Sequence, residues 1–151
     1  MIESSENGVR PASEADLEAI NKIRAQLRLT AIGLEDLSSE GRTTFVSTQS
    51  GAVIGYATVR FPASRHQLQY AEVEQLFVSC DIQRTGVGTA LLQRAQRFAC
   101  AETTATHLYL RVAEEFEKAQ RCYIKFGFKI TGREGQGVLM TKPIREHESD
   151  A

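Results

Sequence analysis

The sequence predicts a single α/β domain built on one sheet of mixed strand direction. Its 151 residues fit one domain. Segments with the alternation of strands are interleaved with segments of helical periodicity, which is the pattern of an α/β fold. No repeat, low-complexity tract or Pro/Gly-rich linker divides them. We therefore expect one domain over residues 1–151, with a core at about residues 8–144 and flexible termini.

The first elements are a short strand around Gly8–Arg10 and a helix that starts near Glu14. Ser13-Glu14-Ala15-Asp16 has the S/T-x-x-D/E form of a capping box, which marks the start of a helix. The residues that follow at helical spacing are Leu17, Ile20, Ile23, Arg24 and Leu27.

A β-hairpin is predicted next. Thr43–Thr48 and Ala52–Arg60 are rich in β-branched and aromatic residues, and Gln49-Ser50-Gly51 joins them with good turn chemistry. Pro62 ends the second strand, and Glu72–Val78 forms a third.

The C-terminal half alternates helices and strands. Thr89–Ala101 is expected to be a helix with one apolar face, formed by Ala90, Leu91, Ala95 and Phe98. The remaining expected elements are a strand at His107–Val112, a helix at Glu115–Phe126, and strands at Phe128–Thr131 and Gly137–Thr141.

Composition excludes several classes of function. With 18 Lys plus Arg against 19 Asp plus Glu, the net charge is −1, so binding to nucleic acid through a general excess of positive charge is not expected. No apolar run is long enough to span a bilayer. Cys80, Cys100 and Cys122 match neither a disulfide framework nor a zinc motif. We expect a cytoplasmic protein without a metal ion.

The most specific local feature is Gln83-Arg84-Thr85-Gly86-Val87-Gly88, which lies between a strand and a helix. Backbone N–H groups of such a turn, together with the positive end of the helix, can hold a phosphate. The alternative is a tight turn without a ligand. The dinucleotide-binding fingerprint needs a third glycine where this sequence has Leu91. The ATP/GTP-binding loop needs Gly-Lys-Ser/Thr, which the sequence also lacks here.

Two motifs together resemble the GNAT superfamily of N-acetyltransferases. The acyl-CoA signature Gln/Arg-x-x-Gly-x-Gly/Ala is met by Gln83, Gly86 and Gly88. A second element, Ala-x-x-x-Tyr-x-x-x-Gly-Phe, is met by Ala119, Tyr123, Gly127 and Phe128. Val9-Arg10-Pro11-Ala12 with Asp16-Leu17 is also typical. The resemblance covers about residues 8–144 and implies a mixed, mostly antiparallel twisted sheet of six to seven strands with about four helices.

The resemblance implies that the cosubstrate is acetyl-CoA. Its pyrophosphate would lie on main-chain N–H groups of residues 84–89, and its pantetheine arm along the strand 76–78. Replacing Gly86 or Gly88 by a bulky residue should then weaken CoA binding more than Arg84→Ala. The implied cofactor-binding residues are Leu76, Phe77, Val78, Gln83, Arg84, Thr85, Gly86, Val87, Gly88, Thr89 and Ala119.

The resemblance also implies that Tyr123 protonates the leaving thiolate, the alternative being a core tyrosine. A phenol stays protonated at pH 7, which suits an acid. Glu72 and Glu74 lie on one strand face by period-two alternation and are both candidates for the base that accepts the amine proton. The alternative is a solvated acidic pair, and a β-bulge in this strand would change how they face. The oxyanion donor would be a main-chain N–H near Phe77 or Val78.

Several questions stay open in the sequence. The acceptor can be a small-molecule amine, a peptide N-terminus or a lysine, and a homodimer is consistent with the family. Phe116 occupies the position where many members have an asparagine that contacts the pantetheine. The alternative to an enzyme is a non-catalytic acyl-CoA-binding or regulatory module.

Overall fold

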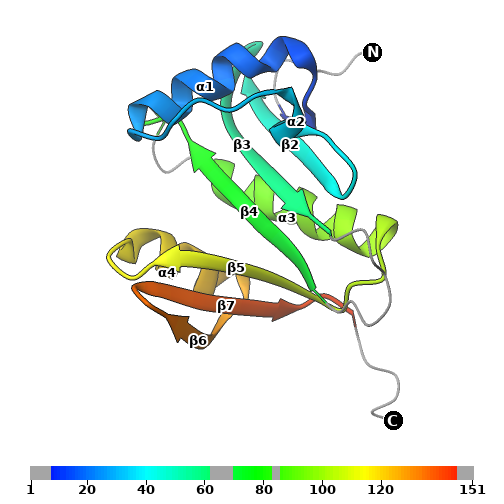
Figure 1. The fold of residues 1–151 in the computed structure, drawn as a ribbon, viewed down its shortest axis with the longest axis vertical. Helices are drawn as coiled ribbons and strands as arrows, with labels where there is room; N and C mark the ends of the chain where they lie inside the picture. The colour runs from blue at the N-terminus through cyan, green and yellow to red at the C-terminus, as the bar shows by residue number, and fades with distance from the viewer. Residues whose placement is uncertain (1–7, 62–69, 83–85, 146–151) are drawn as a thin grey trace.

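The computed structural model describes residues 8–61, 70–82 and 86–145. In these ranges the chain forms seven strands and four α-helices around one sheet, which confirms the predicted fold class (Figure 1). The strands are β1 (Gly8–Pro11), β2 (Arg42–Gln49), β3 (Ala52–Arg60), β4 (Tyr70–Val78), β5 (His107–Ala113), β6 (Lys129–Glu134) and β7 (Gly137–Pro143). The helices are α1 (Leu17–Gln26), α2 (Leu34–Leu37), α3 (Val87–Glu102) and α4 (Glu117–Phe126), and a 3-10 turn, Glu14–Asp16, precedes α1.

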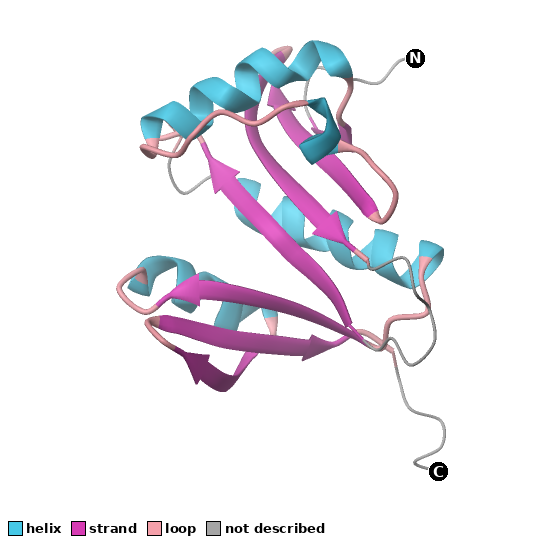
Figure 2. Cartoon of the chain, viewed as in Figure 1, coloured by secondary structure: helices cyan, strands magenta, loops and turns pink. Residues whose placement is uncertain are grey.

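The strand order is β1-β2-β3-β4-β5-β7-β6. Among the described strands β4 and β5 are parallel neighbours, and all other neighbours are antiparallel. These two strands pair only from Tyr70↔His107 to Glu72↔Tyr109 and then separate. Figures 1 and 2 show them meeting near the start of each strand and diverging toward their arrowheads. The sheet is thus split in its middle.

Two hydrophobic cores cover opposite faces of the sheet. Along β3, Tyr56 packs with α1 in one core, and its neighbour Ala57 packs with α3 in the other, as strand alternation requires. The α1 core also contains Ile20, Ile23, Leu37 and Val46. The larger core includes residues of both α3 and α4, so these two helices share a face of the sheet.

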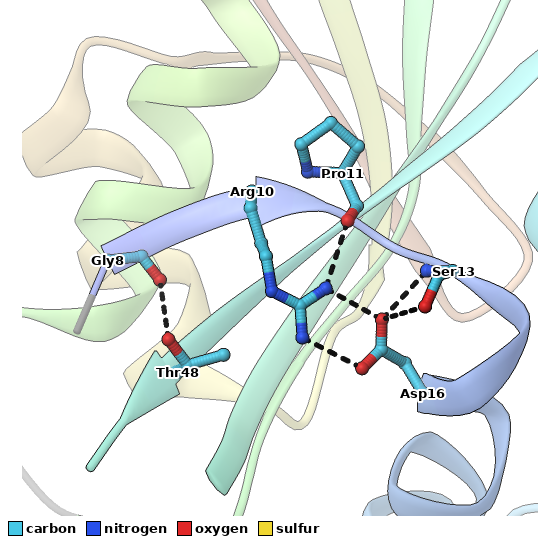
Figure 3. A network of polar contacts seen from close by, with 6 residues as sticks. All are labelled: Gly8, Arg10, Pro11, Ser13, Asp16 and Thr48. Atoms are coloured by element: carbon cyan, nitrogen blue, oxygen red, sulfur yellow. Dashed lines mark hydrogen bonds and ion pairs between the residues drawn. The ribbon is translucent and has the colours of Figure 1, made fainter. Parts of the chain in front are cut away.

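A polar network joins β1 to the start of α1 (Figure 3). The Arg10 guanidinium donates two hydrogen bonds, of 2.8 and 2.9 Å, to the Asp16 carboxylate, which is 6% exposed. The backbone N–H of Ser13 donates to the same carboxylate at 2.7 Å. The Arg10 hydrogen bonds are the main reason why the pKa of Asp16 is lowered. The Arg10 and Asp16 positions of the family resemblance therefore have a structural role.

The starts of three helices differ from the prediction. The helix expected to start near Glu14 begins there as a 3-10 turn, and α1 itself starts at Leu17. Helix α3 begins at Val87, two residues early, because Gly86 caps it. Its buried face also includes Val87, Leu92 and Ala99, while Ala90 and Phe98 are half-buried. Helix α4 begins at Glu117, two residues late, because the backbone of Phe116 is not helical.

Among the helices in the described ranges, none is long and apolar enough to cross a membrane.

Candidate active site

A cleft opens between β4 and β5 where the two strands stop pairing. It has a volume of about 670 Å³. One side is the β4 wall, which we define as residues 73–77; the facing side, which we call the α4 wall, is residues 115–123. Leu27 at the end of α1 and Phe116 line the cleft and are 36% and 55% exposed. Apolar side chains thus reach solvent at the cleft.

Strand β4 presents unpaired main-chain groups to the cleft. The N–H of Ser79 donates to the Ile54 carbonyl at 2.8 Å, and the register continues through Val78↔Gly55. Because antiparallel residues bond to the neighbouring strand alternately, the N–H and C=O groups of Leu76 and Val78 point away from β3. Of the two predicted oxyanion donors, Phe77 and Val78, alternation favours Val78.

A smaller hollow, of about 450 Å³, lies at the N-terminus of α3. It is lined by Gly86 through Thr89 and by Val78, Ile82, Cys122, Lys118 and Ala119, and the last two also line the cleft. Gly86 has φ +79°, a left-handed conformation that favours glycine. A Cβ at Gly88 would meet only the Cys122 Sγ, at 4.0 Å. Internal packing therefore does not require a glycine at position 88.

Helix α4 carries a basic stripe, which consists of Lys118, Arg121 and Lys125. These residues line a third hollow, of about 700 Å³, together with Val78, Ser79, Cys80, Ile82 and Cys122. Their spacing of three and four residues places them on one helix face. Within the described ranges none of the three forms an ion pair. Positive charge is thus available next to the hollow at the start of α3.

Tyr123 lies on the α4 wall with its side chain 8% exposed. Its ring packs edge-on against Phe128, with the ring centroids 5.9 Å apart. Burial raises the pKa of Tyr123 to about 12. No described residue forms a hydrogen bond with its hydroxyl, so a protonated phenol in the wall of the cleft is available as a donor.

The rest of the tyrosine motif shapes the end of α4. Gly127 has φ +122°, a backbone conformation that is strained for any residue with a side chain, and a Cβ there would also displace the end of the Lys142 side chain, whose Cε would be 2.7 Å away. The N–H groups of Gly127 and Phe128 donate to the Tyr123 carbonyl at 3.1 and 3.0 Å. Phe128 is 1% exposed. Gly127 and Phe128 therefore hold the helix turn that carries Tyr123.

The two candidate bases, Glu72 and Glu74, are bound differently. Glu74 lines the cleft, and its carboxylate accepts two 2.8 Å hydrogen bonds from Arg42. Glu72 lies at the vertex of the split, opposite Tyr109, and forms an ion pair of 3.5 Å with Arg60. Burial and the charge of Glu74 raise the pKa of Glu72.

A β-bulge interrupts β4, as the sequence analysis anticipated. Thr58 pairs with Gln75 but Val59 pairs with Val73, so Glu74 has no partner on β3. Val73 and Leu76 both pack in the larger core, which is on the α3 side of the sheet (the α3 core). They are three residues apart, whereas regular alternation would place them on opposite faces. Glu72 forms an ion pair with Arg60 of β3, and Glu74 forms one with Arg42 of β2. Arg42 and Arg60 are opposite each other in the sheet, so the two glutamates keep a common face. The bulge changes the facing from Gln75 onward.

The structure brings most of the predicted site together. Glu74, Leu76, Phe77, Ala119 and Tyr123 line the cleft, and Val78, Gly86, Val87, Gly88 and Thr89 line the adjoining hollow. Glu72 stands beside the cleft rather than on its surface. Gln83, Arg84 and Thr85 lie outside the described residues. Within those residues no group of three or more His, Cys, Asp or Glu is arranged to hold a metal ion.

Sequence reasoning missed two features of the site. The basic stripe of α4 had a signal, since Lys118, Arg121 and Lys125 recur at helical spacing one turn apart. Gln75 had no signal of its own, because its position depends on the bulge at Glu74.

The sheet is mixed and split, and Gly86 at the start of α3 and Tyr123 of α4 lie beside the split. This arrangement defines the class of the protein as the N-acetyltransferase fold. A sequence model described as the Acetyltransferase (GNAT) family matches residues 11–128. The chain belongs to this family.

Particular relatives agree with this assignment. An uncharacterized N-acetyltransferase of Mycobacterium tuberculosis H37Rv is 30% identical over 98 residues, which are 65% of this chain and 60% of the relative. The chain thus matches less than two thirds of that relative's length.

Solved structures show the same fold. PaiA N-acetyltransferase from Thermoplasma acidophilum, in complex with coenzyme A, has a TM-score of 0.71 at 16% identity and covers 89% of this chain and 97% of its own. Ribosomal-protein-alanine N-acetyltransferase from Brucella melitensis has a TM-score of 0.74 at 20% identity, with coverage of 89% and 98%.

Proposed function

We propose that this protein transfers an acetyl group from acetyl-CoA to a primary amine by direct attack in a ternary complex. The observation that carries the proposal is the cleft between β4 and β5. On one side lie main-chain groups of Leu76 and Val78 that pair with no described strand, and Tyr123 lines the other side. Membership of the GNAT family supports the same reaction.

The residues around the cleft fit an acyl-CoA. The pantetheine arm contains amides, which can pair with the free N–H and C=O groups of β4 as an added strand does. Phosphates fit the hollow at the start of α3, where the Gly86–Thr89 N–H groups and the helix dipole favour an anion. The basic stripe of α4 supplies further positive charge. PaiA, a protein of the same fold, was solved with coenzyme A.

Acetyl-CoA, when bound, supplies the activated acetyl group, and the protein supplies proton transfer and orientation. We assign Glu72 as the base, acting through a water molecule, because burial raises its pKa, whereas both carboxylate oxygens of Glu74 already accept hydrogen bonds from Arg42. The Val78 N–H is directed at the thioester oxygen. Tyr123 donates its proton to the departing sulfur. Burial raises the pKa of the phenol, and burial in the same cleft also raises the pKa of the CoA thiol that accepts the proton.

The second candidate function is a non-catalytic acyl-CoA-binding module. Phe116 favours it, because this exposed aromatic ring stands where many family members have an asparagine that contacts the pantetheine. Tyr123, which lines the cleft and whose hydroxyl bonds to no described residue, favours the enzyme.

The deciding experiment measures thiol release from acetyl-CoA with a panel of amines, for the wild type and for Tyr123→Phe. We expect turnover with at least one amine, and a decrease in kcat of about 100-fold or more in the variant with unchanged CoA affinity. CoA binding without turnover on any amine, and no effect of Tyr123→Phe, identifies the binding module instead.

Gly88→Val tests the phosphate site and should weaken CoA binding more than Arg84→Ala.

We further propose that the protein works in a reducing compartment, the cytoplasm. The support for this is that Cys80, Cys100 and Cys122 are all free thiols, and Cys80 is exposed. A homodimer remains part of the proposal and is tested by sedimentation.

A further inference from the structure

A buried polar network lies behind the β4 wall. Arg24 of α1 is 9% exposed. Its Nη1 donates to the Gln75 Oε1 at 2.5 Å and to the Tyr56 hydroxyl at 2.9 Å, and its Nε donates to the Thr30 carbonyl at 2.7 Å. The Tyr56 hydroxyl also donates to the Gln75 Oε1, at 2.6 Å. Within the described ranges Arg24 has no carboxylate partner, which is unusual for a buried cation.

This network orients the side-chain amide of Gln75. A guanidinium can only donate hydrogen bonds, so the Gln75 atom that faces Arg24 is the amide oxygen and not the nitrogen. Two donors hold that oxygen, and the NH₂ group is directed away from them. Gln75 lines the cleft, and no described residue accepts a hydrogen bond from its Nε2. The cleft therefore contains a fixed donor without an acceptor.

The β-bulge is what brings this donor to the site. With regular alternation from Val73, Gln75 would face the α3 core, but the extra residue Glu74 turns it to the α1 side. There it meets Arg24, whose charge polarises the amide through its oxygen and strengthens its N–H groups as donors.

We infer that the Gln75 NH₂ binds an oxygen of the acceptor, and that the acceptor carries a carbonyl or carboxylate next to the carbon that bears its amine. The α-amine of an amino acid or of a peptide N-terminus has such an oxygen. A lysine side chain or a polyamine has none at that distance and would leave the donor unpaired. This inference names the acceptor class and rests on the proposed function.

The test compares amine pairs that differ only in the carbonyl group. Leucinamide is compared with 3-methylbutylamine, alaninamide with ethylamine, and tyrosinamide with tyramine. Binding to the CoA-loaded protein is measured by NMR titration, and kcat/KM by thiol release from acetyl-CoA. We expect at least one carbonyl-bearing amine to bind about 10-fold or more tightly than its partner, because a site built around a polar donor rejects an analogue that lacks the matching oxygen.

The variant Gln75→Glu isolates the donor. It keeps an oxygen for Arg24 and Tyr56 and replaces the NH₂ group by a second oxygen, so the preference in binding should fall to about 3-fold or less. Gln93→Glu, on the exposed side of α3, adds the same charge elsewhere and should keep the preference.

Two results overturn the inference: equal binding of both members in every pair by the wild type, or an equal loss for both members in Gln75→Glu. A preference in binding that depends on Gln75, found without any thiol release, supports the inference while it contradicts the proposed acetyl transfer.

Discussion

On the β4 wall of the cleft, polar side chains are held in place by short bonds to residues behind them, whereas on the α4 wall the charged side chains form no ion pair with any described residue. Gln75 and Glu74 are fixed by arginines of α1 and β2. Lys118 and Arg121 have no ion-pair partner among the described residues. Fixed groups can discriminate between small substrates, while charges without an internal ion-pair partner suit a flexible, highly charged cosubstrate. The difference supports the proposal that β4 selects the acceptor and that α4 attracts CoA.

The largest effect is expected at Glu72, which lies on β4 directly before the β4 wall. Glu72→Gln should lower kcat by about 100-fold, since it removes the base. In the wild type, kcat/KM should fall with decreasing pH as Glu72 becomes protonated, at a pH above its ordinary pKa of about 4.3. The variant should lose this acidic limb in a pH–rate profile. Glu74→Gln is the matched control, and we expect it to keep the acidic limb. If Glu74→Gln lost the limb and Glu72→Gln kept it, Glu74 would be the base instead of Glu72.

The second effect concerns how α1 is attached behind the β4 wall. Asp16→Asn should lower the free energy of unfolding at pH 7 by about 2 kcal/mol, because a buried carboxylate loses its charged hydrogen bonds to Arg10. The pKa of Asp16 is lowered in the folded state, so its stabilisation is present above its ordinary pKa of about 3.9 and is lost as the pH falls through the lower folded value.

Urea unfolding of both proteins from pH 7 downward measures this difference, which should shrink in acid. Glu134→Gln serves as the control: its carboxylate, 3.7 Å from Arg111, is 69% exposed, and the change should be within about 0.5 kcal/mol. A difference that grows in acid would be inconsistent with the lowered pKa.

A third effect tests the α4 wall. The triple variant Lys118→Ala, Arg121→Ala and Lys125→Ala should weaken CoA binding about 10-fold at low salt, because each solvated charge contributes well under 1 kcal/mol. The weakening should diminish at high salt. Calorimetry at two salt concentrations measures both. The control is a triple variant that removes the same charge from exposed positions elsewhere: Arg97→Ala, Lys129→Ala and Arg133→Ala. An equal loss of CoA affinity in this control would show that net charge, and not the position of the basic stripe, causes the effect.

The smallest effect is expected at Phe116. Phe116→Asn restores the residue found in many family members, and because the side chain is 55% exposed we expect CoA affinity to change by about 3-fold or less. A much larger gain in affinity, without a gain in kcat, would favour the binding-module alternative.

Tyr123 of the α4 wall and Glu74, Leu76 and Phe77 of the β4 wall could be predicted from the sequence, whereas Gln75 could not. Tyr123, Gly127 and Phe128 lie within six residues, and their geometry follows from one helix turn and one positive φ. The role of Gln75 depends on Arg24, 51 residues away in the sequence, and on a bulge that reverses the strand's facing. Period-two alternation places Gln75 on the wrong face, so side-chain contacts between distant elements were needed to find it.

The split between β4 and β5 gives the sheet an edge in its interior. The amide protons of Leu76 and Val78 belong to a central strand yet have no strand partner on the cleft side. Amide hydrogen exchange should therefore be fast at these two positions and slow at Phe77, which bonds to β3. CoA that pairs with this edge would complete the sheet, protect both amides and raise the melting temperature. In this protein the bound cosubstrate would act as a missing strand of the fold.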